Sequence, residues 1–305
     1  MSTAFRPRHP LLVLLWGLGI LIVMNLHQYL GAVVGARMGG LTFESVISGE
    51  AQNPLSHLGQ GIVAALIGIP LAYLAIVLLW KRSVGWMRLR FSGRLAMGGF
   101  LLGLILPLAV LAAISITGNV SVTASPSRLS AGQSAMILVS TLCWMSFIAF
   151  SEETVFRGIV VREWASRWGW KVATLLGGLL FGASHLPGVS GGLSLVSTIW
   201  ILTAGVAVTI LFVALYVRGQ SLWLPIGFHA GWNLCLQGVL GVTISGKEPG
   251  NALFQMDVSG QNWLTGGTFG LEASIVAIAV YLLAAVIVLR FGRLTDSHLL
   301  NPNPD

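Results

Sequence analysis

Two adjacent glutamates, Glu152 and Glu153, follow a long apolar run in a chain that has only 10 acidic residues in 305. Carboxylates are costly to place at the edge of hydrocarbon, so acidic residues in such segments usually have a function. Arg157 follows four residues after Glu153 and five after Glu152. On a helix, this spacing lets the guanidinium pair with at least one of the two carboxylates.

Two histidine patterns occur in later apolar segments. The pattern F-x-x-x-H runs from Phe181 to His185, and the pattern H-x-x-x-N runs from His229 to Asn233. His229 and Asn233 are four residues apart, so they share one face of a helix. Polar groups within apolar helices avoid lipid and face the bundle interior or a watery cavity. The sequence therefore predicts that these side chains and the two glutamates meet inside the protein.

The chemistry that this set permits is hydrolysis. Glu152 can act as a general base toward water. His229 and Asn233 can donate hydrogen bonds to an oxyanion as it develops. His185 can orient the water or protonate a leaving amine.

Each pattern also has a purely structural explanation when it is taken alone. Glu153 and Arg157 can form an ion pair at a helix end. An intramembrane histidine, or an asparagine such as Asn233, often forms a hydrogen bond between helices. The occurrence of all three patterns, on three different helices, favours a shared function over coincidence.

In this order, the three patterns resemble the CPBP family, which comprises the CAAX proteases and bacteriocin-processing enzymes and is also called the Abi family. Members of this family are polytopic intramembrane endopeptidases. The resemblance covers about residues 135–245, and no motif position departs from the family pattern. The pattern T-G-G-T-F-G-L-E, from Thr265 to Glu272, extends it toward the last apolar segment.

The resemblance implies two groups of site residues. The catalytic group is Glu152, His185, His229 and Asn233. The supporting group is Glu153, Arg157 and Phe181. In this scheme the first glutamate activates water, the first histidine helps to hold that water, and the second histidine forms the oxyanion site with the asparagine.

No cofactor is expected, although the donor types also suit a metal. Two histidines and one glutamate are ligands of many catalytic zinc sites. If a divalent metal such as zinc is bound, its ligands would be Glu152, His185 and His229. The H-E-x-x-H pattern of zinc proteases does not occur in the sequence, so that route has no support from a motif.

Transmembrane helices must position these residues. Hydrophobic residues make up 55% of the chain and charged residues 9%, whereas soluble domains carry about 25% charged residues. Long unbroken apolar runs predict helices rather than the alternating strands of a barrel. The predicted spans are residues 11–34, 60–80, 95–117, 135–156, 171–187, 193–217, 221–243 and 271–290. The predicted fold class is an all-α polytopic membrane protein of about eight helices around an intramembrane polar cavity.

The basic residues predict the orientation of these spans. Of the 17 Lys and Arg residues, all but Arg37, Arg128 and Lys247 fall in one alternating set of flanks. Such flanks are cytoplasmic, so both termini are predicted to lie inside. The net charge of +7 is thereby explained as a topology signal, and no nucleic acid partner is expected. Residues 1–134 would supply the first three helices, residues 135–290 the catalytic bundle, and residues 291–305 a short cytoplasmic tail.

These boundaries place Glu152 and His185 at different depths in the membrane, although the two side chains are expected to meet. His185 would lie about 21 Å along the helix axis from Lys171, at about 1.5 Å per residue. Glu152 would lie only about 8 Å from Arg157 on its own helix. For the two side chains to meet, a helix must tilt, extend into the cytoplasm or start deeper than these boundaries place it.

Other proteolytic chemistries find less support. An aspartyl type needs two intramembrane aspartates, and the only aspartates, Asp257, Asp296 and Asp305, lie outside the predicted spans. A serine type would rely on Ser184 or Ser190, and neither stands in a recognisable nucleophile turn.

Two functions other than proteolysis remain. A non-catalytic immunity or scaffold protein of the same fold has no need of the whole polar set. A proton-coupled transporter with Glu152 and Glu153 as its relay predicts inverted repeats and broken helices in both halves, and the first half has no polar counterpart to the second. The expected substrate is a membrane-associated protein or peptide in contact with the lipid bilayer, and the compact chain is typical of a bacterial inner membrane protein.

Overall fold

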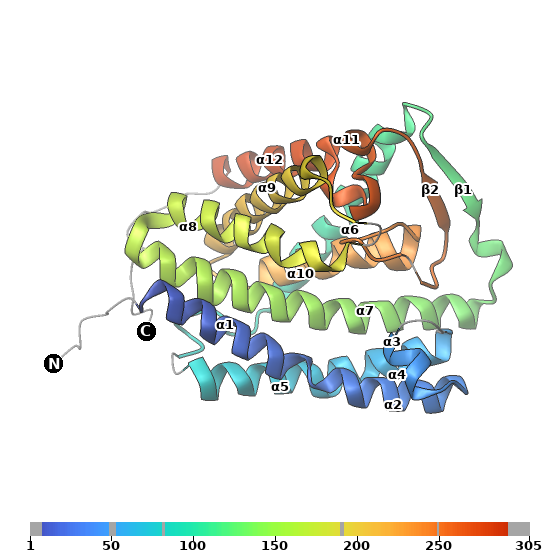
Figure 1. Cartoon of the computed structure of the whole chain (residues 1–305), viewed down its shortest axis with the longest axis horizontal. Helices are drawn as coiled ribbons and strands as arrows, with labels where there is room; N and C mark the ends of the chain where they lie inside the picture. The colour runs from blue at the N-terminus through green and yellow to red at the C-terminus, as the bar shows by residue number, and fades with distance from the viewer. Residues whose placement is uncertain (1–7, 49–52, 81–82, 190–191, 249, 292–305) are drawn as a thin grey trace.

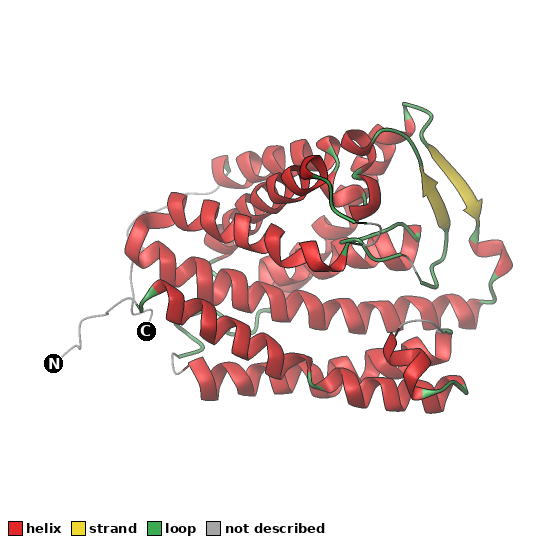
Figure 2. Ribbon diagram, viewed as in Figure 1, coloured by secondary structure: helices red, strands yellow, loops and turns green. Residues whose placement is uncertain are grey.

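The computed structural model describes residues 8–48, 53–80, 83–189, 192–248 and 250–291. Helices make up most of this part of the chain, with one two-stranded ribbon at an end of the bundle (Figure 2). Among the described residues, five helical stretches are long and apolar enough to cross a membrane. The predicted fold class, an all-α polytopic membrane protein, is therefore confirmed.

The bounds of the elements follow the apolar runs. The helices of the first half are α1 (Pro10–Asn25), α2 (His27–Gly39), α3 (Phe43–Ser48), α4 (Pro54–Val63), α5 (Ile69–Ala75) and α6 (Gly93–Ser115). Those of the second half are α7 (Ala131–Glu153), α8 (Arg162–His185), α9 (Leu195–Gly219), α10 (Trp223–Asn233), α11 (Asn262–Thr265) and α12 (Ile275–Arg290). Strands β1 (Val120–Ala124) and β2 (Gln255–Val258) pair antiparallel.

Helix α7 runs through the middle of the molecule (Figure 1). On one side it is flanked by α1, α2, α4 and α5, and on the other by α8, α9, α10 and α12. Helix α1 begins and α12 ends at the same end of the bundle (Figure 1). This agrees with an even number of crossings, and the assignment of that end to the cytoplasm remains a prediction.

Each of the eight predicted spans contains helix. Four of them coincide with long apolar helices at Pro10–Gly39, Pro54–Trp80, Gly93–Ser115 and Leu195–Gly219. The fourth and fifth predicted spans form the fifth stretch, Ala131–Gly188, which is helical almost throughout. The last two predicted spans correspond to shorter helices. The seventh is α10 extended by a π-helical segment, Leu234–Leu240, and the eighth is α12.

The predicted end of the fourth span at residue 156 is wrong. The helix of α7 continues through a π-helical segment, Thr154–Val161, into the first part of α8. Arg157 and Arg162, which the charge pattern placed in a cytoplasmic flank, are buried in the bundle. Each guanidinium has a buried partner, Glu153 for Arg157 and the Tyr216 hydroxyl for Arg162. Several residues named in the sequence predictions lie outside the described residues. They are Arg6, Lys81, Arg82 and Arg293 of the cytoplasmic set, together with Ser190, Asp296, Asp305 and the predicted tail apart from its first residue.

The chain reverses direction within α8 at Gly169. This residue has φ 78° and ψ 160°, which no residue of a helix adopts and which glycine reaches without steric cost. The two arms then pack against each other in register. The rings of Phe156 and Phe181 lie 5.0 Å apart, and Gly177 packs against Val161. The arms thus form an antiparallel hairpin with Gly169 at its tip.

The hairpin brings Glu152 and His185, which were predicted at different depths, to the same depth. Glu152 precedes Gly169 by 17 residues and His185 follows it by 16, so each lies about 25 Å from the tip at about 1.5 Å per residue. Equal distances along antiparallel arms bring the two side chains to one level. Of the three ways in which the side chains could meet, the structure uses extension of the helix beyond its predicted end.

Helix α10 is held against α6 by close backbone contact. A Cβ at Gly99 or Gly103 of α6 would overlap the carbonyl oxygens of α10, and one at Gly227 or Gly231 of α10 would overlap those of α6. Small residues four apart on both partners let membrane helices approach closely. The contact fixes the position of α10, which carries His229.

Candidate active site

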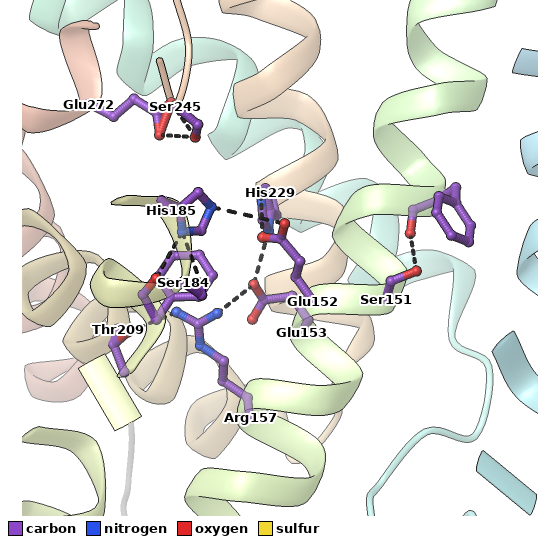
Figure 3. A network of polar contacts seen from close by, with 12 residues as sticks. Ser151, Glu152, Glu153, Arg157, Ser184, His185, Thr209, His229, Ser245 and Glu272 are labelled. Carbon is purple, nitrogen blue, oxygen red and sulfur yellow. Dashed lines mark hydrogen bonds and ion pairs between the residues drawn. The ribbon is translucent and has the colours of Figure 1, made fainter. Parts of the chain in front are cut away.

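Glu152 lies between the two predicted histidines (Figure 3). Its Oε1 atom is 4.0 Å from Nε2 of His185, and its Oε2 atom is 3.8 Å from Nε2 of His229. These contacts join α7, the far end of α8 and α10. The side chain of Glu152 is 23% exposed and that of His185 is 18% exposed. The three predicted groups therefore meet at one point that is open to a cavity.

Glu153 is fully buried and contacts the same His229 ring from its other nitrogen. Its Oε1 atom accepts hydrogen bonds from Nη1 of Arg157 at 3.0 Å and from Nδ1 of His229 at 2.9 Å. The latter contact directs the other ring nitrogen of His229 toward Glu152. The predicted supporting role of Glu153 therefore has a geometric basis, because this carboxylate orients the imidazole in the way that a buried aspartate orients a catalytic histidine.

Arg157 is enclosed on all sides. Its guanidinium lies 4.3 Å from the ring centres of Phe181 and Phe212, and its Nη2 atom donates to Oγ1 of Thr209 at 2.9 Å. Stacking on aromatic faces and charge-assisted hydrogen bonds both favour arginine at a buried site. Phe181 also contacts the ring of His185, with 4.7 Å between ring centres. Arg157 and Phe181 thus connect the buried ion pair to both histidines.

π-helical segments follow two of the predicted motif positions. One begins at Thr154, directly after Glu153, and the other at Leu234, directly after Asn233. π-helical turns widen a helix locally and occur often at functional sites. Each segment begins directly after motif residues, so each affects the direction in which the neighbouring motif side chains point.

Glu152, His185, His229 and Asn233 line a cavity of about 950 Å³. Asn233 is largely buried, and within the described residues no group hydrogen-bonds its side-chain amide. The amide N–H groups are therefore free to bind an oxyanion. The Ser184 hydroxyl donates to the Phe181 carbonyl at 2.7 Å, and its Oγ atom lies 3.3 Å from Nδ1 of His185.

Parts of the site were not predicted. The wall of the cavity opposite α8 comes from the first half of the chain and includes Gln28, His57 and Gln60. Single polar residues in apolar helices were the available signal, but their spacing did not link them to the motifs. Thr209, the partner of Arg157, was a similar signal within the sixth span.

The donor groups match a zinc site in type more closely than in spacing. Two ligands of one zinc ion, each bonded at about 2.0–2.2 Å with tetrahedral angles, lie about 3.3–3.6 Å apart. The separations of Glu152 from His185 and His229 are longer, at 4.0 and 3.8 Å. Among the residues that the structure describes, no group of three or more acidic, histidine or cysteine side chains is placed to hold a metal ion. We therefore derive the chemistry of the site from the side chains alone.

The comparison with known families agrees with the resemblance that the motifs predicted. Residues 134–235 match the family described as Rce1-like, type II CAAX prenyl endopeptidase Rce1-like. The matched segment includes every predicted catalytic and supporting residue. No curated protein and no solved structure matches the chain. The resemblance of this segment to the CAAX proteases is therefore confirmed.

Proposed function

We propose that this chain is an intramembrane endopeptidase of the CAAX protease type that hydrolyses a peptide bond in a membrane-associated protein or peptide. The observation that carries the proposal is the position of the Glu152 carboxylate, on the cavity wall between the ring nitrogens of His185 and His229. The chain is a multi-pass membrane protein, and the location we propose for it is a bacterial inner membrane.

The spacing around Glu152 suits one bridging water molecule. Separations of 3.8 and 4.0 Å are too long for direct hydrogen bonds. They are short enough for a single water to contact the carboxylate and an imidazole together. In this position Glu152 takes a proton as the water oxygen attacks the carbonyl carbon of the substrate.

The oxyanion that forms in this step is stabilised from α10. The amide of Asn233 and the Nε2–H group of a protonated His229 lie on the same helix face and point into the cavity. Prearranged donors of this kind stabilise charge that develops only in the transition state. The carbon–nitrogen bond then breaks, and Glu152 returns its proton to the leaving amine. The products are a carboxylic acid and an amine.

The proposal is tested by comparing protein termini in membranes from cells that express the wild type or the Glu152→Gln variant. We expect new amino and carboxyl termini that appear only with the wild type, because the amide of glutamine cannot accept the proton from water. Mass spectrometry would identify the termini and hence the substrate. Identical termini, with both proteins inserted at equal levels, would instead support a non-catalytic immunity or scaffold protein.

Hydrolysis should not depend on a divalent metal. We expect 1,10-phenanthroline or EDTA to change the rate of the purified protein by less than about twofold, because the groups around Glu152 complete the chemistry without a Lewis acid. The measurement is cleavage of the identified substrate before and after dialysis against chelator. Loss of activity that zinc restores would contradict this expectation and make Glu152, His185 and His229 its ligands.

A further inference from the structure

The cavity contains a second carboxylate that the proposed chemistry does not use. Glu272 lies on the wall that faces His185 and His229, and the Oγ atom of Ser245 donates to its carboxylate oxygens at 3.2 and 3.5 Å (Figure 3). Both residues line the same cavity as Glu152. Glu272 ends the pattern T-G-G-T-F-G-L-E, which the proposed chemistry leaves without a role.

The glycines of this pattern serve to place Glu272. At Gly270 the backbone has φ 106°, and a Cβ there would overlap the carbonyl oxygen of Thr243. The turn that carries Ser245 is built in a matching way. Ser245 and Gly246 have φ 50° and 78°, and the Gly246 N–H donates to the carbonyl of Phe269 at 2.9 Å. Two loops are thus joined so that Ser245 and Glu272 face each other.

The same loop contacts the catalytic set. The buried ring of Phe269 packs edge-on against His185, with 6.2 Å between ring centres. Phe269 and Glu272 are three residues apart in one tight loop, so the loop presents its carboxylate close to the site of the bridging water. A group bound at Glu272 would therefore belong to the substrate segment next to the cleaved bond.

The electrostatics of the cavity indicate what Glu272 binds. A carboxylate has about four acceptor sites, and the Ser245 hydroxyl occupies only part of this capacity. The Ser245 backbone also hydrogen-bonds the carboxylate. Within the described part of the chain, no Lys or Arg forms an ion pair with Glu272, which lines the cavity. The charged residues that line the cavity are Glu152, Glu248, Glu272 and Lys247, apart from histidines. Even with a protonated His229 and Lys247 counted, these three carboxylates leave the wall with an excess of formal negative charge, which a cation that arrives with the ligand can pair with.

We propose that Glu272 and Ser245 form a specificity subsite for a positively charged side chain, lysine or arginine, near the cleaved bond of the substrate. The inference rests on the proposed peptidase function, because it assigns the subsite to a peptide. It adds a sequence preference that neither the motifs nor the family match contains.

The test measures binding without turnover, in full-length protein purified in detergent and carrying Glu152→Gln. The probes are fluorescein-labelled nonapeptides of leucine and alanine, in which one lysine occupies successive positions. Norleucine at the same position is the reference, because it keeps the aliphatic chain and lacks the charge. For one lysine position we expect a dissociation constant about tenfold lower than that of the norleucine peptide, the ratio for one partly buried charged hydrogen bond.

Adding Glu272→Gln should reduce this ratio to less than about twofold, because the glutamine side chain is neutral. Glu272→Ala should give the same loss and serves if the glutamine variant does not fold. The matched control is Glu44→Gln, which removes the same charge from an exposed residue of α3 outside the cavity and should leave the ratio unchanged. Circular dichroism and gel filtration would establish that each variant is folded.

The proposal is wrong if no lysine position is preferred over norleucine, or if the preference persists without the Glu272 carboxylate. It is also wrong if Glu272→Gln, in protein that retains Glu152, slows the hydrolysis of both peptides equally without changing either dissociation constant. That result would make Glu272 a proton donor. Because binding is measured without turnover, a protein that cleaves nothing can still show the preference, which separates this test from that of the peptidase function.

Discussion

Replacing Glu152 by glutamine should lower kcat for peptide hydrolysis by about 10³-fold, within the range that a positioned general base contributes. KM should change little, because the variant keeps the shape of the side chain at the cavity wall. The thermal unfolding temperature should also stay the same, since Glu152 is separated from its two histidine neighbours by 3.8 Å or more. The measurement is steady-state cleavage of the substrate identified from its new termini, with protein in detergent or nanodiscs.

The control for this experiment is Glu44→Gln, the same chemical change at an exposed position that does not line the cavity. It should retain the full rate. Wild-type activity in the Glu152→Gln variant would exclude Glu152 as the base and leave the fully buried Glu153, which contacts Arg157 and His229 rather than the cavity. Partial recovery in Glu152→Asp would support the carboxylate itself as the active group.

Replacing Arg157 by methionine should destabilise the protein by about 3–5 kcal/mol, because the change leaves the Glu153 carboxylate buried without its cation. Both side chains are fully buried, so neither can recover hydration in the folded protein. The expected fall in unfolding temperature is about 10 °C. Thermal unfolding of purified protein measures it. The control, Arg90→Met, changes an exposed residue and should stay within about 0.5 kcal/mol of the wild type.

The double variant Glu153→Gln/Arg157→Met separates stability from positioning. It removes both charges, and buried pairs can often be replaced by neutral groups at little cost. We expect the unfolding temperature to recover by more than half. Activity should stay low, because His229 loses the carboxylate that orients its ring. Recovery of both stability and activity would show that the pair is only structural.

The fold class was predictable because it depends on local sequence, and the meeting of the motif residues was predictable from the cost of polar groups in lipid. Apolar runs mark the helices. Glu152, His185 and His229 are costly in lipid unless they face a shared interior, and the structure joins them as this cost requires. The catalytic roles of these residues remain predictions, which the variants above test.

The length of the α7 hairpin arm was not predictable from the charge pattern. Arg157 and Arg162 have the spacing of residues that flank a membrane span, yet each is neutralised or hydrogen-bonded by a partner inside the bundle. The partner of Arg162, Tyr216, lies 54 residues away, so its contribution depends on tertiary packing. For the same reason the cavity wall formed by Gln28 and Gln60 could not be assigned, because nothing in the sequence sets their distance from α7.

The hairpin about Gly169 makes the active site depend on the number of residues in each arm. Adding one residue between Glu152 and Gly169 alone would shift the arm by about 1.5 Å and turn its side chains by about 100° relative to the other. Glu152 would then point away from His185. Natural variants of this hairpin should therefore gain or lose residues in both arms together, or in whole helical turns. Paired insertions or deletions, placed symmetrically about Gly169, would show that the distance between Glu152 and His185 has been conserved by selection.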